Sequence, residues 1–415
     1  MTNTLYPKQN LGFFAKRLKN IRQEKGYSLR GIADAAKVSH VVVSDIENHI
    51  MSPNLETLQA LYKQLDIPFD IDEQRLLNDK NTISMLYEAI YYQNSEESLY
   101  HYRLLHTERR RLFNSLISID AILACSAYNI SNDDFDQLKF LFELEDSLEF
   151  LSESQVQTFN LNMGAYYFKQ KDLQKALNYL NNNLMLYGST KVHSLTLHYL
   201  AMTYERLYRK SNTIHYAVLA SNLHADFANF NRKIEADLLM AKKFIEVGRF
   251  NRAQSVLATI DLTINIDDHY TLVQELRFLK SYLLYRKRDY EGALRVFQET
   301  PMNLMYKSLY EVIIYYRMNK LKIAKAKLEE HLKNVDKESI FDVISKVLLY
   351  DIEGDYQDED FEKSCLKVIE QRFYVRDVYL LKLVYDILIR YYEANNRYED
   401  ALKFAKSFVN IVISS

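Results

Sequence analysis

The sequence has few residues that interrupt helices and almost no cysteine. Only 8 glycines and 4 prolines occur among 415 residues, and this scarcity of turn-forming residues argues against a protein of many short strands. The two cysteines, Cys125 and Cys365, are too far apart in sequence to suggest a disulfide framework or a zinc motif. Such sparing use of cysteine is typical of a reducing compartment, and we expect a cytoplasmic protein.

Apolar runs that could enter a membrane are also lacking. The first twenty residues contain no apolar run before their charges, which is unlike a secretion signal. No stretch of about 18 apolar residues occurs anywhere in the chain. We therefore expect neither a signal peptide nor a membrane span.

Motifs of catalysis and of cofactor binding are missing as well. No glycine-rich phosphate loop and no HExxH zinc motif occurs. The pairs His101 and His106, and His193 and His198, are each five residues apart, a spacing that turns two helical side chains about 140° away from each other. The sequence therefore predicts a protein that is not an enzyme and uses no metal or cofactor.

The charge is balanced overall but unevenly distributed. The chain carries 53 Lys and Arg against 55 Asp and Glu, whereas residues 1–68 carry nine Lys and Arg against six Asp and Glu. The N-terminal end is therefore the part suited to contact DNA phosphates. The run Glu108-Arg109-Arg110-Arg111 is interpreted as an ion-pair cluster or a solvated face near a linker, with contact to the DNA backbone as the alternative.

The first 68 residues are predicted to form short helices around one small core. Gly26 is expected to end the first helix. Ser28 and Ser39 are expected to cap the next two helices, and the segment Ser52-Pro53-Asn54 is expected to open the fourth. Apolar residues recur at helical spacing and should face inward: Phe14, Leu18, Ile21, Ile32, Ala33, Ala36, Val43, Ile46, Leu55, Leu58, Leu61 and Leu65.

These elements resemble the phage-repressor (Cro/cI, or XRE) helix-turn-helix family over about residues 11–68. The shared elements are Leu18-x-x-Ile21-Arg22-x-x-Lys25-Gly26, Ile32-Ala33, Val38-Ser39, Val43-Ser44-x-Ile46-Glu47-Asn48 and Ser52-Pro53-x-Leu55-x-Thr57-Leu58. The resemblance implies that the third helix enters the major groove of double-stranded DNA. Side chains expected to meet base edges are Ser39, His40, Val41, Val42, Ser44 and Asp45. Phosphate contacts are expected from Arg17, Arg30, Lys37 and Asn54.

The segment departs from the family pattern at several positions. Leu29 stands where the second helix usually has Gln, and Lys37 replaces the turn glycine, which would place a non-glycine residue in a left-handed conformation. Val41 and Val42 can contact thymine methyls but cannot make bidentate hydrogen bonds, so readout would be weak or biased to A·T pairs. Asp45 would face DNA unfavourably unless it accepts from cytosine or pairs with a neighbour. The alternative is a domain that has lost DNA binding and mediates protein contacts only.

From about residue 75 the sequence reads as helical throughout and contains a weak repeat. Small residues recur at positions 176, 213, 253, 293, 324, 364 and 401. The pattern resembles the tetratricopeptide repeat, a pair of helices with a basic period of about 34 residues. The small residue lets the two helices approach, and stacked pairs would form a right-handed solenoid with a concave inner face. The predicted fold is all-α, with a helix-turn-helix domain at 1–70, a linker helix and degenerate repeats at 71–150, and a repeat domain for ligand sensing and dimerisation at 151–415.

A helix-turn-helix domain followed by degenerate tetratricopeptide repeats resembles the Gram-positive peptide-pheromone regulators, the Rap, Rgg, NprR, PlcR and PrgX group, of which NprR is closest in length and layout. The resemblance covers most of the chain in architecture rather than in close sequence. It implies a short signalling peptide bound in the solenoid groove, a homodimer formed through the repeats, and DNA binding that depends on the ligand.

A peptide guest needs amide groups for its backbone, apolar pockets for its side chains and charges for its termini. In the repeat register, the second, fifth, ninth and twelfth positions of each first helix should turn inward, with the thirteenth near the rim. The peptide-facing residues selected in this way, together with Asn162 beside them, are Phe168, Lys169, His198, Met202, Arg206, Glu235, Lys242, Tyr282, Tyr285, Arg286, Tyr306, Tyr316, Arg317, Asp386 and Arg390. The alternative for each aromatic or Met side chain is helix packing, and for each charged one plain solvation.

Two other functions are compatible with this sequence. In one, the repeats bind a partner protein and DNA contact is secondary. In the other, the chain is a phage or plasmid repressor whose repeats only dimerise. A co-purifying peptide would favour the peptide hypothesis over both.

Overall fold

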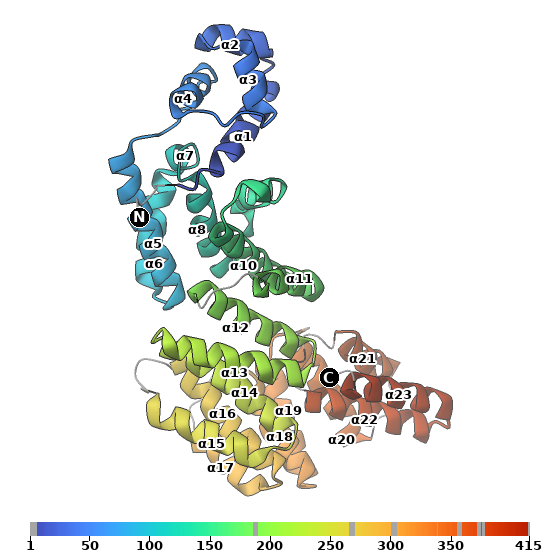
Figure 1. The fold of residues 1–415 in the computed structure, drawn as a ribbon. Coiled ribbons are helices and arrows are strands. Elements are labelled where there is room, and N and C mark those ends of the chain that lie inside the picture. The colour runs from blue at the N-terminus through green and yellow to red at the C-terminus, as the bar shows by residue number, and fades with distance from the viewer. Residues whose placement is uncertain are drawn as a thin grey trace. The chain divides into compact units, whose positions relative to one another are not determined.

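The computed structural model describes residues 6–185, 190–264, 270–299, 305–337, 339–354, 359–371, 375 and 378–413. These residues form helices joined by short turns, with one isolated β-bridge between Asp70 and Ser115 (Figure 1). The chain divides into two compact units, residues 1–196 and 197–415, with the boundary inside α12. The all-α fold with a helix-turn-helix start is confirmed. The sequence-based boundaries at residues 70 and 150 lie within the first unit.

The first unit contains the helix-turn-helix domain, here called the head, and a set of helices that follow it. The head comprises α1 (Asn10–Glu24), α2 (Leu29–Ala36), α3 (His40–Glu47) and α4 (Leu55–Gln64). It is followed by α5 (Glu73–Tyr91), α6 (Ser95–Thr107), α7 (Arg109–Leu112), α8 (Ser118–Ser131), η1 (Phe135–Gln137), α9 (Lys139–Glu143), η2 (Glu145–Phe150), α10 (Glu153–Lys169) and α11 (Leu173–Leu184).

The core of the head is the one that the apolar pattern predicts. Nine of the twelve predicted residues are buried, and Ile21, Ala36 and Leu55 are half-buried. The hydroxyl of Tyr62 donates to the carbonyl of Phe14 at 3.0 Å and ties α4 to α1. Burial of this many aliphatic side chains is what stabilises four helices too short to persist alone.

The second unit is a tandem of antiparallel helix pairs. From α14 onward each pair packs internally and against the next one along the chain (Figure 1). From the shared helix α12 (Lys191–Arg206) onward the helices are α13 (Lys210–Asp226), α14 (Phe230–Glu246), α15 (Phe250–Thr263), α16 (Tyr270–Arg286), α17 (Tyr290–Glu299), α18 (Met305–Arg317), α19 (Leu321–Asn334), α20 (Ile340–Glu353), α21 (Glu359–Glu370), α22 (Val378–Ala394) and α23 (Tyr398–Ile413).

The turn inside each pair fixes the repeat register. One residue with positive φ ends the first helix of each pair: Lys171, Tyr208, Gly248, Arg288, Asn319, Gly354 and Asn396. In six of the seven pairs the predicted small residue follows this turn residue by five positions, at 176, 213, 253, 293, 324 and 401. All six are buried, because the two helices of a pair are closest there. Gly164 serves the same purpose on α10, since a Cβ there would lie 2.6 Å from the side chain of Leu180 on α11.

The exception is α21, where the predicted small residue, Ser364, is half-exposed. The next residue, Cys365, is fully buried instead. The prediction was wrong by one residue. The five-residue spacing that places the small residue in the other pairs does not apply here, since the turn residue Gly354 lies ten positions before Ser364.

Candidate functional sites

The side of the head that is predicted to face DNA is built by local side-chain caps. The Ser28 hydroxyl accepts from the Gly31 amide at 2.9 Å, and the Ser39 hydroxyl accepts from the Val41 amide at 3.3 Å. The Asn54 side chain accepts from the Thr57 amide at 2.7 Å. The predicted starts of α2, α3 and α4 are therefore confirmed, and the three N-termini retain further amides that could hold phosphate.

The turn between α2 and α3 contains the predicted left-handed residue. Lys37 has φ 56° and ψ 39°, which is the conformation that glycine adopts without cost. Its side chain is exposed. The replacement of glycine by lysine therefore preserves the turn and adds a charge beside the start of α3.

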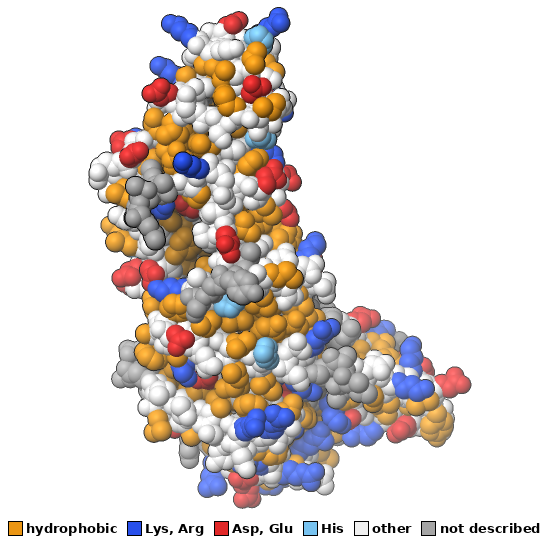
Figure 2. All heavy atoms as spheres, in the orientation of Figure 1, with side chains coloured by type: hydrophobic (Ala, Val, Ile, Leu, Met, Phe, Trp, Pro, Cys, Tyr) orange, Lys and Arg blue, Asp and Glu red, His pale blue; other side chains and the backbone are white. Residues whose placement is uncertain are grey.

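Helix α3 presents the predicted recognition residues outward. Val43 and Ile46 are fully buried, whereas Val41 is 53% exposed. Ser39 and His40 are exposed, and Val42, Ser44 and Asp45 are half-buried. Lys and Arg side chains also project at the end of the head where α2 and α3 lie (Figure 2). The face predicted to meet DNA is thus open, and Val41 is the most exposed apolar residue of α3.

A buried ion pair, which the sequence did not point to, holds α1 against α3. The Arg22 guanidinium donates to both carboxylate oxygens of Glu47, at 2.6 and 2.7 Å, and to the carbonyl of Tyr27 at 2.7 Å. The Glu47 hydrogen bond raises the pKa of Arg22 against the opposing effect of burial. Breaking such a pair on one side leaves an unpaired buried charge, which costs about 3–5 kcal/mol. The pair therefore fixes the position of the recognition helix.

The predicted phosphate contacts fall into two groups. Arg30, Lys37 and Asn54 are exposed on the side of the head that is predicted to face DNA. Arg17 is instead engaged within the unit, since its guanidinium donates to the carbonyl of Phe113 and lies 5.9 Å from the Phe140 ring.

Helix α1 attaches the head to the helices that follow it. The Asn10 amide donates to the Phe150 carbonyl at 2.7 Å and to the Gln155 side chain at 2.9 Å. Gln155 donates to Asp120 at 2.8 Å and belongs to the capping box that starts α10. Burial raises the pKa of Asp120. We call this set, Asn10, Asp120, Phe150 and Gln155, the head joint, and it connects α1 directly to α8 and α10.

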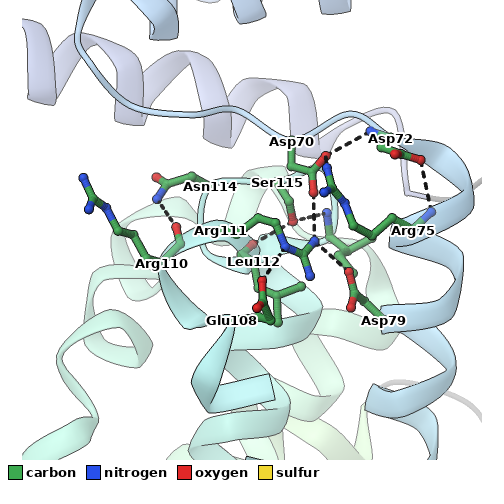
Figure 3. A network of polar contacts seen from close by, with 11 residues as sticks. Asp70, Asp72, Arg75, Asp79, Glu108, Arg110, Arg111, Leu112, Asn114 and Ser115 are labelled. Atoms are coloured by element: carbon green, nitrogen blue, oxygen red, sulfur yellow. Dashed lines mark hydrogen bonds and ion pairs between the residues drawn. The ribbon is translucent and has the colours of Figure 1, made fainter. Parts of the chain in front are cut away.

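An ion-pair network holds the linker that leaves the head (Figure 3). Arg111 donates to Asp70, Asp79 and Glu108 at 2.8, 2.8 and 2.9 Å, and Arg75 donates to Asp70 at 2.9 Å. Although burial raises it, the pKa of Asp70 is lowered overall by hydrogen bonds from Arg111 and Arg75. For Arg111 the ion-pair interpretation is confirmed, whereas Arg110 is exposed.

Several predicted peptide contacts are buried and already paired. The Asn162 amide donates to the Leu123 carbonyl at 2.9 Å, and Phe168 and Tyr282 are buried. His198 Nδ1 lies 3.3 Å from His224 Nε2. Burial lowers the pKa of both histidines to about 3.

The remaining candidates are more accessible. Met202, Arg206 and Tyr285 are half-buried. Lys242 pairs with Glu205 at 2.8 Å and Asp386 pairs with Lys382 at 2.6 Å. Tyr306 lies outside the described side chains.

Two of the predicted residues, Tyr285 and Arg286, lie near the end of α16. The Arg286 guanidinium stacks 3.5 Å above the ring of Tyr379, whose hydroxyl donates to the Glu246 carbonyl at 2.8 Å. Nearby, the Tyr208 hydroxyl donates to the Val375 carbonyl at 2.5 Å. The chain's own residues therefore cover the ends of α12, α14 and α16 in this structure.

Three other predicted residues meet at one open pocket of about 390 Å³. Tyr316, Arg317 and Arg390 line it together with Asn319, Leu321 and Asp351. Sequence reasoning missed Asp351, although it is the twelfth residue of α20, as Tyr316 is the twelfth of α18. Applying the inward-position rule to α20 would have selected it.

The two cysteine thiols are buried and are not activated. Burial raises the pKa of Cys125 to about 12 and also raises that of Cys365, so both thiols stay protonated at neutral pH. No group of three or more His, Cys, Asp or Glu among these residues is placed to hold a metal. In the same part of the chain, no helix is both long and apolar enough to cross a membrane.

Comparison with known proteins covers both parts of the chain. Residues 18–71 match the helix-turn-helix family model. Over 403 residues the chain is 24% identical to the transcriptional activator NprA of Geobacillus stearothermophilus, covering 89% of this chain and 96% of that protein.

Solved structures share the fold at lower identity. The apo form of the quorum sensor NprR from B. thuringiensis is 17% identical, with a TM-score of 0.64 over 82% of this chain and 99% of that one. NprR in complex with its cognate peptide NprX has a TM-score of 0.60 at 15% identity, over 80% and 98% of the two chains. A Rap protein complexed with competence and sporulation factor has a TM-score of 0.64 at 14% identity, over 80% and 97%. The chain is therefore a homologue of the transcriptional activator NprA, with an XRE-type helix-turn-helix domain at its N-terminus and the fold of the NprR and Rap proteins.

Proposed function

We propose that this chain is a DNA-binding transcription regulator whose activity is controlled by a short signalling peptide bound in its repeat domain. The observation that carries the proposal is the similarity to NprA over 96% of that activator's length, which includes the head and the helical repeats together. The fold shared with NprR, which has been solved with its cognate peptide NprX, supports a peptide as the input.

The DNA-binding part of the proposal rests on the exposed face of the head. Ser39, His40 and Val41 at the start of α3 are positioned to meet base edges in the major groove. Arg30, Lys37 and Asn54 flank them and would hold phosphates. With exposed valine and no arginine on α3, we expect a preference for A·T-rich sites.

The coupling part of the proposal rests on the head joint. Gln155 starts α10 and is hydrogen-bonded to Asn10 at the start of α1. A change in the packing of α10 would therefore be passed to the head directly. In a homodimer, such a change would move two heads relative to half-sites about 34–36 Å apart.

The DNA-binding part can be tested with sites selected from random DNA by the full chain. We expect Arg30→Ala to weaken binding and to reduce the slope of log K against log salt by about 0.9, the effect of one lost phosphate contact. Lys63→Ala is the matched control, because Lys63 is exposed in the last turn of α4. Equal affinities and salt slopes for the two variants would contradict the assignment of the DNA-facing side.

The peptide part can be tested by mass spectrometry of the protein purified from its host. A co-purifying short peptide, whose synthetic form changes the affinity for the selected DNA, is the expected result. A stable protein partner without a peptide would favour a solenoid that binds proteins. DNA binding unaffected by any peptide would favour a repressor whose repeats only dimerise.

A further inference from the structure

The open pocket described above is built by three successive first helices of the repeat pairs. Helix α18 supplies Tyr316, α20 supplies Asp351 and α22 supplies Arg390. The Tyr316 hydroxyl donates to one oxygen of Asp351 at 2.5 Å, and Arg390 donates to the other oxygen at 2.8 Å and to the tyrosine oxygen at 2.9 Å. These three side chains form a preorganised floor, because each holds the other two.

The arrangement leaves N–H donors of the Arg390 guanidinium accessible to solvent. The side chain of Asp351 is only 5% exposed, whereas that of Arg390 is 48% exposed. Nη2 of Arg390 makes both hydrogen bonds to the floor, and its other N–H groups have no partner in the described part of the chain. Since a guanidinium carries five donors in a fixed fork, the outer edge of Arg390 remains able to bind a planar anion.

Arg317 adds a second cation at the rim. Its side chain is exposed and makes no ion pair with any described residue. Asp351 neutralises Arg390, so Arg317 leaves the pocket with one net positive charge. Asn319 adds an amide and Leu321 an apolar wall. An amide, an apolar wall and one excess positive charge suit the last residue of a peptide, with its amide nitrogen, its side chain and its terminal carboxylate.

The charge count also discriminates between anions. A phosphate group carries close to two negative charges at neutral pH, and the carboxylate of Asp351 is among the groups that line the pocket. The single negative charge of a carboxylate is balanced by the one excess positive charge of the pocket, and its planar shape fits the guanidinium of Arg390. A dianion would instead leave one negative charge uncompensated next to Asp351. The pocket therefore suits a carboxylate better than a phosphate.

We infer that this pocket binds the free C-terminal carboxylate of the signalling peptide, through Arg317 and the outer edge of Arg390. The inference rests on the proposed function and narrows its ligand class to peptides with an unblocked C-terminus. Tyr316 and Asp351 act as positioning residues that hold Arg390 in place.

The test uses the full chain and two pools of random heptapeptides that differ only in a free carboxylate or an amide at the C-terminus. Peptides retained after gel filtration are identified by mass spectrometry. We expect the free-acid pool to be enriched and the best sequences to bind at least tenfold more tightly as acids than as amides. Retention of both forms equally would overturn the carboxylate inference while leaving peptide control intact. Retention of neither pool would reject peptide control and this subsite with it.

A pair of matched variants locates the effect at the pocket. Arg317→Gln should abolish the preference for the free acid, and Arg317→Lys should restore most of it. Lys322→Gln is the control, because Lys322 is exposed on α19 nearby but does not line the pocket. If Arg317→Gln keeps the same acid preference as Lys322→Gln, the carboxylate is bound elsewhere and the assignment of this pocket is wrong.

Discussion

Gly12 offers a direct test of whether the head is docked through α1. A Cβ added at this position would lie 2.2 Å from Cδ1 and 2.5 Å from Cε1 of Phe150, whereas carbon atoms pack at about 3.5–4.0 Å. The Phe150 ring would have to move by more than 1 Å. It packs against His49 at 4.7 Å between ring centroids, so the movement disturbs a second contact of the head.

The sign of the Gly12→Ala effect distinguishes a docked head from a free one. Overpacking costs about 1–3 kcal/mol, and replacing glycine by alanine within a helix gains about 0.5–1 kcal/mol. In a docked head the difference is a net loss of about 0–2.5 kcal/mol. In an undocked head only the gain remains, so the variant would be more stable than the parent.

The measurement is the free energy of unfolding from urea titration, with hydrogen exchange of the α1 amides as a local reading. In a Phe150→Ala background the same Gly12→Ala change should become neutral or stabilising, because the clash has been removed. The coupling between the two sites should be about 0.5–3 kcal/mol. If Gly12→Ala raises stability equally in both backgrounds, the contact between α1 and Phe150 does not form in solution and the head joint is wrong.

Four further predictions address the linker, the turn and the buried histidines. Arg111→Met should lower the free energy of unfolding by about 1–3 kcal/mol, whereas Arg110→Met, whose side chain is exposed, should leave the urea midpoint unchanged. The pKa of Asp70 is lowered in the folded chain, so the advantage of the parent over Asp70→Asn should be full above about pH 4 and disappear in urea titrations at lower pH. Lys37→Gly should raise the free energy of unfolding by about 1 kcal/mol and with it the melting temperature, and Lys37→Asn should raise both by less. A lower melting temperature for both variants would show that the turn is not left-handed. Because burial lowers the pKa of His198 and His224 to about 3, stability should fall as pH drops below about 6.5, by up to roughly 1.4 kcal/mol per pH unit for each histidine, and His224→Gln should show a shallower fall.

The sequence predicted those features of the fold that depend on local interactions. The caps Ser28, Ser39 and Asn54 bond to amides two or three residues away, so residue type and position suffice to place them. The six small residues at the centre of the helix pairs also follow from a local rule, five positions after the turn. In α21, where that spacing is different, the prediction failed by one residue.

Features that depend on distant partners could not be predicted. The charge and position of Arg17 predict a contact with DNA phosphate, but its guanidinium donates a hydrogen bond to the carbonyl of Phe113, 96 residues away. Asn10 and Gln155 are separated by 145 residues, and nothing in either segment indicates the other. Asn162 has the amide that a peptide clamp needs, yet that amide is used between α10 and α8. Residue type alone does not reveal which hydrogen bonds are already satisfied within the chain.

One distant pair, Asp351 with Arg390, does become predictable once the turn residues are known. Asp351 lies three residues before the turn residue Gly354, and Arg390 lies six before Asn396. Glu205 likewise lies three before Tyr208, and Lys242 six before Gly248. Both pairs are bonded at 2.8 Å. In these two places, the residue six before the turn of a first helix meets the residue three before the turn of the preceding first helix, as expected if stacked pairs repeat one geometry. Once the turn residues are located in the sequence, this spacing predicts Asp351 as the partner of Arg390, and with it the floor of the pocket.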